Sequence, residues 1–458
     1  MRRAGFLFAA VLWAGLAMAA GNDSVLIRDV TIHPVTSGVI EHGSVLIVNG
    51  KIAAVGAKVG GGGARVIEGH GWQLYPGMIN AATNVGLSEI SSLRDSVDLD
   101  EIGMFNPELR AAIAFNPSSE HIDVTRAAGI TSVISLPGSG SEGGFRSNNA
   151  PHVITGQGAL MHLEGWTWED MAVKPSAVMD TVFPQIQMIP ERYASLIPGG
   201  VRTYQDEEKQ YRERLRQMSE FFEDVRRYQK AKTAGGSDFR KDIRLDAMLP
   251  VIEGKQPLFV RAEKVKAIQD AVAFADKEKV KIIIADPQEI GNTGPLLKSH
   301  NIPVVMGKTF TLPEHEDDPY DAPYTLPNDF YKAGVKICFG TFDVEFARNL
   351  PFEAAQAAAF GLPQEEALRA VTINSAEILG VGDQIGSIEK GKTADLILTD
   401  GDPLQARTNI KQVFIAGKPV SLESRHTREY ERWIKRPSSL ASGKSGDGSA
   451  ADAERQQD

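Results

Sequence analysis

Four charged side chains, Arg261, Glu263, Asp286 and Asp343, stand just after apolar stretches and have types that could support hydrolytic chemistry. Arg261 and Glu263 are two residues apart, so their side chains share one face of an extended strand. Asp286 follows the next apolar stretch and is expected at a similar height. A carboxylate of Asp286 or Asp343 could act as general base toward water, and the Arg261 guanidinium could stabilise an oxyanion. The predicted catalytic residues are therefore Asp343, Asp286 and Arg261, with Arg261 paired to Asp286 or to another carboxylate of the pocket.

The same side chains allow two other interpretations. In the first, the ion pair of Arg261 caps the end of a sheet and contributes to stability alone. In the second, Glu263, Asp286 and Asp343 supply oxygen ligands to Ca²⁺ or Mg²⁺, which prefer such donors. The neighbouring positive charge of Arg261 disfavours a cation at this place.

Alternating apolar and amphipathic stretches must position these side chains. Strands are predicted at residues 131–136, 258–262, 280–285, 303–306 and 335–339. A predicted helix at 264–279 separates two of them, and strands that alternate with helices favour a parallel sheet. A chain of 458 residues has room for a closed barrel of about 250 residues or more together with an accessory unit.

Two further blocks, near the two ends of the chain, have the pattern of β-strands. Residues 24–56 alternate between apolar and polar types, with Asn49-Gly50 between two runs as a hairpin signal. A second strand-rich block covers residues 394–420. Because these blocks flank the long α/β region, we expect one small β-domain built from both chain ends.

Five stretches carry a family pattern: Gly43–Gly56, Pro76–Asn84, Arg348–Ala354, Thr372–Ala376 and Gly386–Leu396. They resemble the amidohydrolase superfamily, in particular its imidazolonepropionase-like branch, over about residues 24–436. The resemblance implies a (β/α)8 TIM-type barrel with a small composite β-sandwich. It also implies hydrolysis of C–N bonds in cyclic amides and related substrates with one or two metal ions. The expected units are a signal peptide (1–19), the β-sandwich (20–76 plus 384–424), the barrel (77–383), and a C-terminal helix with a disordered tail (425–458).

The resemblance also implies where metal ligands would stand, and this chain departs from that pattern. Where the first strand would carry an Asp and two His, it has Asn80, Ala82 and Asn84. Phe342 occupies the place of the eighth-strand Asp, and Asp343 comes one residue late, which turns a strand side chain to the opposite face. Lys174 is a candidate for the bridging-lysine position. None of the nine histidines stands in a ligand position, so neither zinc nor another divalent cofactor is expected.

The N-terminus has the form of a secretory signal. Arg2 and Arg3 precede a short apolar run, and Ala17-Met18-Ala19 is a cleavage site. We therefore expect a secreted or periplasmic protein without a membrane anchor after cleavage. The formal net charge of −10 becomes −12 without Arg2 and Arg3, which argues against nucleic acid as a partner.

Residues 204–233 form a charged amphipathic stretch with apolar residues every three or four positions. It is expected to be a helix that packs on the core, with a partner-binding or lid helix as the alternative. Two functions remain open. One is a secreted hydrolase of non-peptide, cyclic amide-type C–N bonds with a degenerate metal site, acting on a small molecule. The other is a non-catalytic binding or scaffold protein that pairs with itself, a partner or an intact relative.

Overall fold

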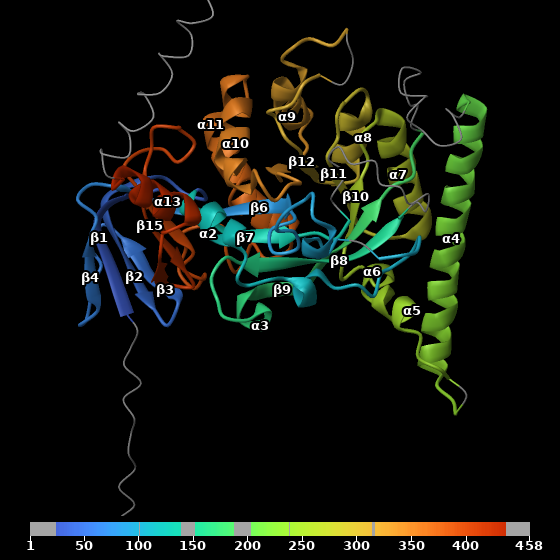
Figure 1. Cartoon of the computed structure of the whole chain (residues 1–458), viewed down its shortest axis with the longest axis horizontal. Coiled ribbons are helices and arrows are strands. Elements are labelled where there is room, and N and C mark those ends of the chain that lie inside the picture. Colours follow the sequence, from blue (N-terminus) through green and yellow to red (C-terminus); the bar gives the residue numbers. More distant parts are fainter. Residues whose placement is uncertain are drawn as a thin grey trace, which may run out of the picture.

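The computed structural model describes residues 24–99, 101–138, 152–186, 203–237, 239–313 and 317–436. They form two sheets, each of eight strands, with helices packed around one of them (Figure 1). The expected signal peptide and the tail beyond residue 436 lie outside the described residues. The predicted fold class, a TIM-type barrel with a composite β-sandwich, is confirmed.

The composite sheet joins both ends of the described chain. Its strands are β1 (Ser24–Ile32), β2 (Ile40–Val48), β3 (Lys51–Gly56), β4 (Arg65–Glu68), β5 (Gln73–Pro76), β14 (Leu396–Thr399), β15 (Ile410–Ile415) and β16 (Lys418–Val420). The N-terminal and C-terminal strands meet where β5 pairs antiparallel with β14. Asn49 and Gly50 both have positive φ, of 50° and 78°, which the predicted tight turn between β2 and β3 requires.

The barrel sheet follows the chain order. Its strands are β6 (Met78–Thr83), β7 (Ile130–Ser135), β8 (Ile154–His162), β9 (Ala172–Val182), β10 (Leu258–Arg261), β11 (Ile282–Ala285), β12 (Val304–Met306) and β13 (Ile337–Phe339). The chain after β13 returns to β6, where the N–H of Phe342 donates to the Ala82 carbonyl at 2.8 Å. This contact brings the last strand back to the first.

One barrel strand departs from the expected parallel arrangement. β8 runs antiparallel to both β7 and β9. Only nine residues, including the short helix α3 (Trp168–Met171), join β8 to β9. A parallel return needs a crossover of about a dozen residues or more, so this connection favours an antiparallel pair.

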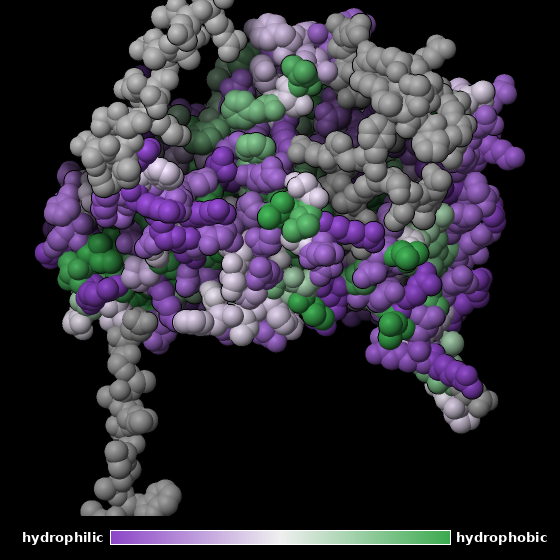
Figure 2. Space-filling model, in the orientation of Figure 1, coloured by the Kyte–Doolittle hydropathy of each residue, from purple (hydrophilic) through white to green (hydrophobic). Residues whose placement is uncertain are grey.

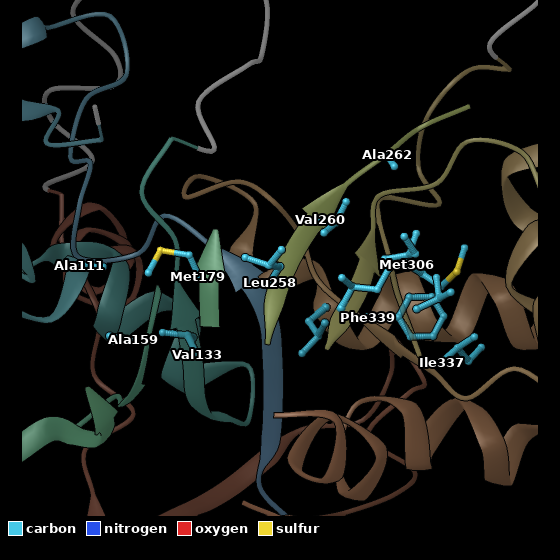
Figure 3. Packing of buried hydrophobic residues seen from close by; sticks show 14 of the residues in the cluster. Ala111, Val133, Ala159, Met179, Leu258, Val260, Ala262, Met306, Ile337 and Phe339 are labelled. Atoms are coloured by element: carbon cyan, nitrogen blue, oxygen red, sulfur yellow. The ribbon is translucent and has the colours of Figure 1, made fainter. Parts of the chain in front are cut away.

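Helices cover the outer surface of the barrel. They are α1 (Ala111–Ala114), α2 (Glu120–Ala127), α4 (Tyr204–Ala234), α5 (Ile243–Ala247), α6 (Leu249–Ile252), α7 (Val265–Glu278), α8 (Thr293–Ser299), α9 (Ala322–Lys332), α10 (Leu350–Ala359), α11 (Gln364–Ala370), α12 (Ile373–Ile378) and α13 (Arg425–Ile434), with two 3-10 turns, η1 (Arg94–Ser96) and η3 (Ala347–Asn349). Alternate residues of the strands pack against these helices. Figure 3 shows Leu258, Val260 and Phe339 among them, all buried. The other face of each strand is therefore left for the barrel interior.

The long helix α4 packs on the core along one face. Its Met218, Phe222 and Val225 are fully buried, and the Phe222 ring contacts Phe274 of α7 edge-on at 5.2 Å. The opposite face carries charged side chains and forms a hydrophilic edge of the molecule in Figure 2. The helix ends at Gly235, whose φ of +67° suits glycine. The core-facing interpretation of this stretch is confirmed, with one residue more than predicted.

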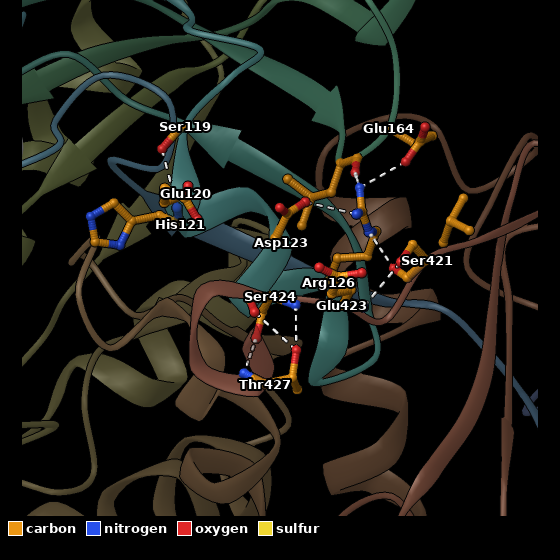
Figure 4. A network of polar contacts seen from close by, with 12 residues as sticks. Ser119, Glu120, His121, Asp123, Arg126, Glu164, Ser421, Glu423, Ser424 and Thr427 are labelled. Carbon is orange, nitrogen blue, oxygen red and sulfur yellow. Dashed lines mark hydrogen bonds and ion pairs between the residues drawn. The ribbon is translucent and has the colours of Figure 1, made fainter. Parts of the chain in front are cut away.

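The C-terminal helix α13 is held against α2. Ser424 and Thr427 form a capping box at its N-terminus, and Arg428 pairs with Glu120 at 2.8 Å. Arg126 of α2 donates to the carbonyls of Ser421 and Leu163, so the segment before α13 is tied to the barrel (Figure 4). No helix among the described residues has both the length and the apolar character needed to cross a membrane.

An ion pair links the barrel to the composite sheet. His162, at the end of β8, lies with Nε2 2.9 Å from Oδ2 of Asp395, and both side chains are nearly buried. Burial lowers the pKa of His162, but the charge and hydrogen bond of Asp395 outweigh burial, so the pKa is raised above its usual value. The folded state therefore favours protonated His162.

The stability that this pair adds should depend on pH. A histidine whose pKa is raised on folding stabilises the protein fully below its unfolded pKa of about 6.5, and the gain is lost as pH rises through the folded pKa. We expect His162→Gln to destabilise the protein by about 1–3 kcal/mol at pH 6, and by clearly less at pH 9. Urea unfolding at both pH values measures this difference. His42→Gln, at an exposed histidine, is the matched control, and an equal loss at both pH values for His162→Gln would contradict the account.

Candidate functional site

The interior of the barrel is built in layers. One apolar residue from each of the eight strands lies in a common buried cluster: Ile79, Ile134, Leu160, Val178, Phe259, Ile283, Val305 and Cys338. The next inward-facing position toward the carboxyl ends of the parallel strands is two residues further along each of them. In a TIM-type barrel this end carries the active site. We call this end, with the loops that follow it, the barrel mouth.

Among the described residues, the inward-facing strand positions at the mouth, which we call the inner layer, hold one charged pair. These positions, on or directly after β9 to β13, are Asp180, Arg261, Ala285, Gly307 and Gly340. Asp180 is fully buried and the Arg261 side chain is 11% exposed. Arg261 Nε donates to Oδ1 of Asp180 at 3.2 Å and Nη2 donates to Oδ2 at 2.8 Å. The pair is therefore bidentate, the geometry that suits guanidinium and carboxylate best.

Further hydrogen bonds complete this pair. Arg261 also donates to the carbonyls of Pro137 and Gly138, each at 3.2 Å. Thr155 Oγ1 donates to Oδ2 of Asp180 at 2.5 Å. Burial raises the pKa of the Asp180 carboxyl, while Arg261 and Thr155 act in the opposite direction. Because most of its N–H groups are engaged, Arg261 has few donors left for an oxyanion. This favours the structural interpretation of the pair, and the catalytic role of Arg261 stays a prediction.

The sequence predicts that Arg261 pairs with a carboxylate of the pocket, which is confirmed, and it names Asp286 first as that carboxylate, which is wrong. The prediction named Asp286 or another pocket carboxylate, and the partner is Asp180. Asp286 follows β11 with a left-handed backbone (φ 53°), is half-buried, and accepts from Gln288 Nε2 at 3.1 Å. Glu263 lies two residues beyond Arg261, half-buried, and its carbonyl accepts from the Gln288 N–H.

The segment after β13 places an aromatic ring where the superfamily pattern would have a carboxylate. Phe342 has a left-handed backbone (φ 51°) and packs on the interior cluster, with its ring centre 6.2 Å from that of Phe259. Asp343 is turned to a different partner, since its Oδ2 lies 2.9 Å from Lys308 Nζ and its Oδ1 accepts from the Phe346 N–H at 2.9 Å. The Phe342 side chain therefore faces the barrel interior, and the Asp343 side chain does not.

A buried glutamate holds the loop that carries Lys308. Glu353 of α10 is 2% exposed, and its Oε2 accepts from the N–H of Thr309 at 2.6 Å and from Thr309 Oγ1 at 2.8 Å. The N–H of Phe310 donates to the same oxygen at 3.1 Å. Glu353 thus fixes the backbone just after Lys308, and with it the position of the Lys308–Asp343 pair.

The residues at the three expected ligand positions of β6 have structural roles. Asn80 donates from Nδ2 to Thr341 Oγ1 at 2.9 Å and accepts from the Thr341 N–H, which joins β6 to the end of β13. Ala82 is fully buried in the interior cluster. Asn84 donates to the Leu136 carbonyl at 3.0 Å and joins β6 to β7.

Lys174 does not lie at the mouth, so its assignment to a bridging-lysine position is wrong. It stands six residues before Asp180 on β9, at the opposite end of the barrel, and its Nζ donates to the Leu379 carbonyl at 3.0 Å. Asp180, Thr155, Lys308 and Glu353 were missed by sequence reasoning. The one available signal was an aspartate inside the apolar run Val178–Val182.

The residues present at the mouth do not fit the metal that the fold implies. Zinc and similar ions need three or four nitrogen, sulfur or carboxylate ligands that converge. Among the described residues, no group of three or more His, Cys, Asp or Glu is arranged to hold a metal ion. Asp180 is the carboxylate at the inward-facing strand positions, and a guanidinium already neutralises it. The other positions there carry alanine, glycine and the Phe342 ring, which supply no ligand. The Asp286 carboxylate, which follows β11, lies against Gly307, where an added Cβ would clash with its Oδ1.

A cavity of about 980 Å³ opens in the loop that follows β6. Its described lining is mostly polar and acidic: Gly86, Leu87, Glu89, Ser91, Ser92, Arg94, Asp95, Ser96, Val97, Asp98, Glu101, Ala114, Asn116 and His152. The N–H of Gly138, whose carbonyl binds Arg261, donates to the Leu99 carbonyl in this same loop. The cavity therefore adjoins the mouth and has the volume of a small-molecule site.

Comparison with known proteins places this architecture in a family. Residues 327–420 match the model of the amidohydrolase family. An amidohydrolase named tasK from Hapsidospora irregularis is 23% identical over 399 residues, which cover 79% of this chain and 38% of tasK. An imidazolonepropionase from Shewanella frigidimarina is 31% identical over 29% of this chain and 28% of that protein. The chain thus spans well under half the length of these two curated relatives.

A solved structure extends the likeness to almost the whole described fold. The amidohydrolase from Thermotoga maritima is 26% identical with a TM-score of 0.74, over 87% of this chain and 99% of that one. The chain therefore belongs to the amidohydrolase superfamily and is similar to its imidazolonepropionase-like members.

Proposed function

We propose that this chain is a small-molecule-binding member of the class of hydrolases of non-peptide C–N bonds, and that its barrel mouth works without a resident transition metal. Membership in the superfamily and its hydrolase relatives support the class of bond. The Arg261–Asp180 pair supports the second part, because it occupies the inner layer that a metal would need. The ligand proposed is a cyclic amide or imide, bound in the cavity beside the mouth.

Without a metal, hydrolysis of an unactivated amide has to be slow. A bound metal lowers the pKa of water by several units, and a side-chain base alone cannot replace that effect. The first proposal is therefore binding without efficient turnover. We also propose that the protein is exported, as its predicted signal sequence indicates, and that it pairs with an intact relative, since barrels of this superfamily often form oligomers. Cell fractionation tests the export, and co-purification tests the pairing.

Metal-free hydrolysis is the second candidate, and the Lys308–Asp343 pair is the observation that favours it. The two groups lie 2.9 Å apart at the edge of the mouth. Asp343 would accept a proton from water as the water oxygen bonds to the carbonyl carbon. Lys308 would give a proton to the nitrogen as the C–N bond breaks. This step uses only the two side chains, water and the amide.

The two candidates differ in one experiment on purified protein. Hydantoin and succinimide are titrated by calorimetry, and their hydrolysis is followed with and without added Zn²⁺ or Mn²⁺. Saturable binding with no turnover supports the first candidate. Metal-independent turnover that falls about 100-fold or more in Asp343→Asn supports the second. Lys418→Met, at an exposed residue of β16, is the control and should change nothing. Turnover that requires the metal, or no binding at all, would contradict both.

A further inference from the structure

A second cavity lies at the opposite end of the barrel from the mouth. It has a volume of about 380 Å³ and opens at the amino ends of β10, β11 and β12, next to the end of α12. Its lining includes Lys174, Lys255, Lys281, Asp276 and His300. None of these residues takes part in the site described above, so this cavity is separate from the proposed function.

Lys174 is a charged group that is only partly satisfied. It is half-buried, and among the described residues its Nζ makes one hydrogen bond, to the Leu379 carbonyl at 3.0 Å. Burial lowers its pKa, and no neighbouring carboxylate offsets that effect. An ammonium group has three N–H donors, so Lys174 keeps donors that can face the cavity.

The other charged groups around the cavity add to this positive charge. Lys281 and Lys255 are exposed and line the cavity, and Lys255 Nζ contacts Glu253 at 2.7 Å. Asp276 is the one carboxylate among the described lining residues, and it already lies 3.1 Å from His300 Nε2. Three lysines therefore stand against Asp276 in the lining and Glu253 beside it, which leaves the pocket positive in a chain whose net charge is −10.

We propose that this cavity binds a small oxyanion, either a phosphate or a dicarboxylate, with Lys174 as its central contact. An oxyanion would accept the hydrogen bonds that Lys174 has left, and its charge would offset the cost of the half-buried ammonium. Lys255 and Lys281 would neutralise the remaining charge from the rim. The volume is sufficient for either ligand with its bound water.

Two probes separate the possible sources of the oxyanion. Inorganic phosphate and succinate are each titrated into the full chain by calorimetry at low and at moderate salt. Saturable one-site binding of either probe is expected, and the tighter probe identifies the ligand type. Lys174→Met, which keeps most of the length of the side chain and removes the charge, should weaken binding about tenfold or more. Lys174→Arg should retain most of it.

Two controls test whether the loss of binding is specific to the cavity. Lys418→Met removes a lysine on β16 of the composite sheet and should leave binding unchanged. Circular dichroism and the melting temperature show whether each variant is folded. Absence of saturable binding in the natural chain, or equal affinity for the natural chain and a folded Lys174→Met, would overturn the proposal. Neither result bears on amide binding at the mouth.

Discussion

Replacing Asp180 with alanine is expected to destabilise the protein by about 3–5 kcal/mol, because it leaves the Arg261 guanidinium buried without a counter-charge. Asp180 is fully buried and accepts from both Arg261 and Thr155. The loss is therefore larger than that of one hydrogen bond. Urea unfolding of the variant, compared with the unchanged chain at the same pH, gives the difference in free energy of unfolding.

A double replacement distinguishes the effect of the two charges on stability from the effect of the side-chain volume. Asp180→Leu combined with Arg261→Met removes both charges and should recover most of the stability, since an apolar pair of similar volume avoids the desolvation cost. Glu220→Ala breaks an exposed ion pair on α4 and should leave the unfolding midpoint unchanged. A loss below about 1 kcal/mol for Asp180→Ala would mean that the pair is solvated, and would contradict its place in the inner layer.

The second large effect is expected from Phe259, in the apolar layer directly beneath that pair. Phe259 is fully buried, belongs to the interior cluster, and contacts the Phe342 ring. Phe259→Ala should cost about 3–5 kcal/mol through lost burial and the cavity left behind. Phe259→Leu keeps most of the volume and should cost less than about 1.5 kcal/mol.

Thermal and urea unfolding of both variants measure these costs. Phe310→Ala, at an exposed phenylalanine, is the matched control and should have little effect. Equal stability of Phe259→Ala and Phe259→Leu would show that the ring does not fill the barrel interior. In that case the layered arrangement below the mouth would be wrong.

The strands and the long helix could be predicted because their signals are local. The runs that end at Arg261 and Ala285, and the amphipathic repeat over 204–233, depend on residues a few positions apart. The Asn49-Gly50 turn likewise carries its backbone preference in its own residue types. Each of these features appears in the structure close to where the sequence places it.

The site could be predicted only in part, because its pairings are tertiary. Arg261 and Asp180 are 81 residues apart, and no spacing rule joins them. β9 contains Lys174 and Pro175 and has no regular alternation, so its inner face could not be read from sequence. The left-handed backbone of Phe342 decides which side chain of that segment enters the barrel, and phenylalanine gives no sign of such a conformation.

The direct measurement of the central claim is the metal content of the purified protein and its affinity for Zn²⁺. If the Arg261–Asp180 pair holds the inner layer, mass spectrometry should find far less than one metal ion per chain, and calorimetry should find no tight site. One equivalent of zinc, bound tightly and lost in Asp180→Asn or Asp343→Asn, would show that the mouth assembles a metal centre and would contradict the account.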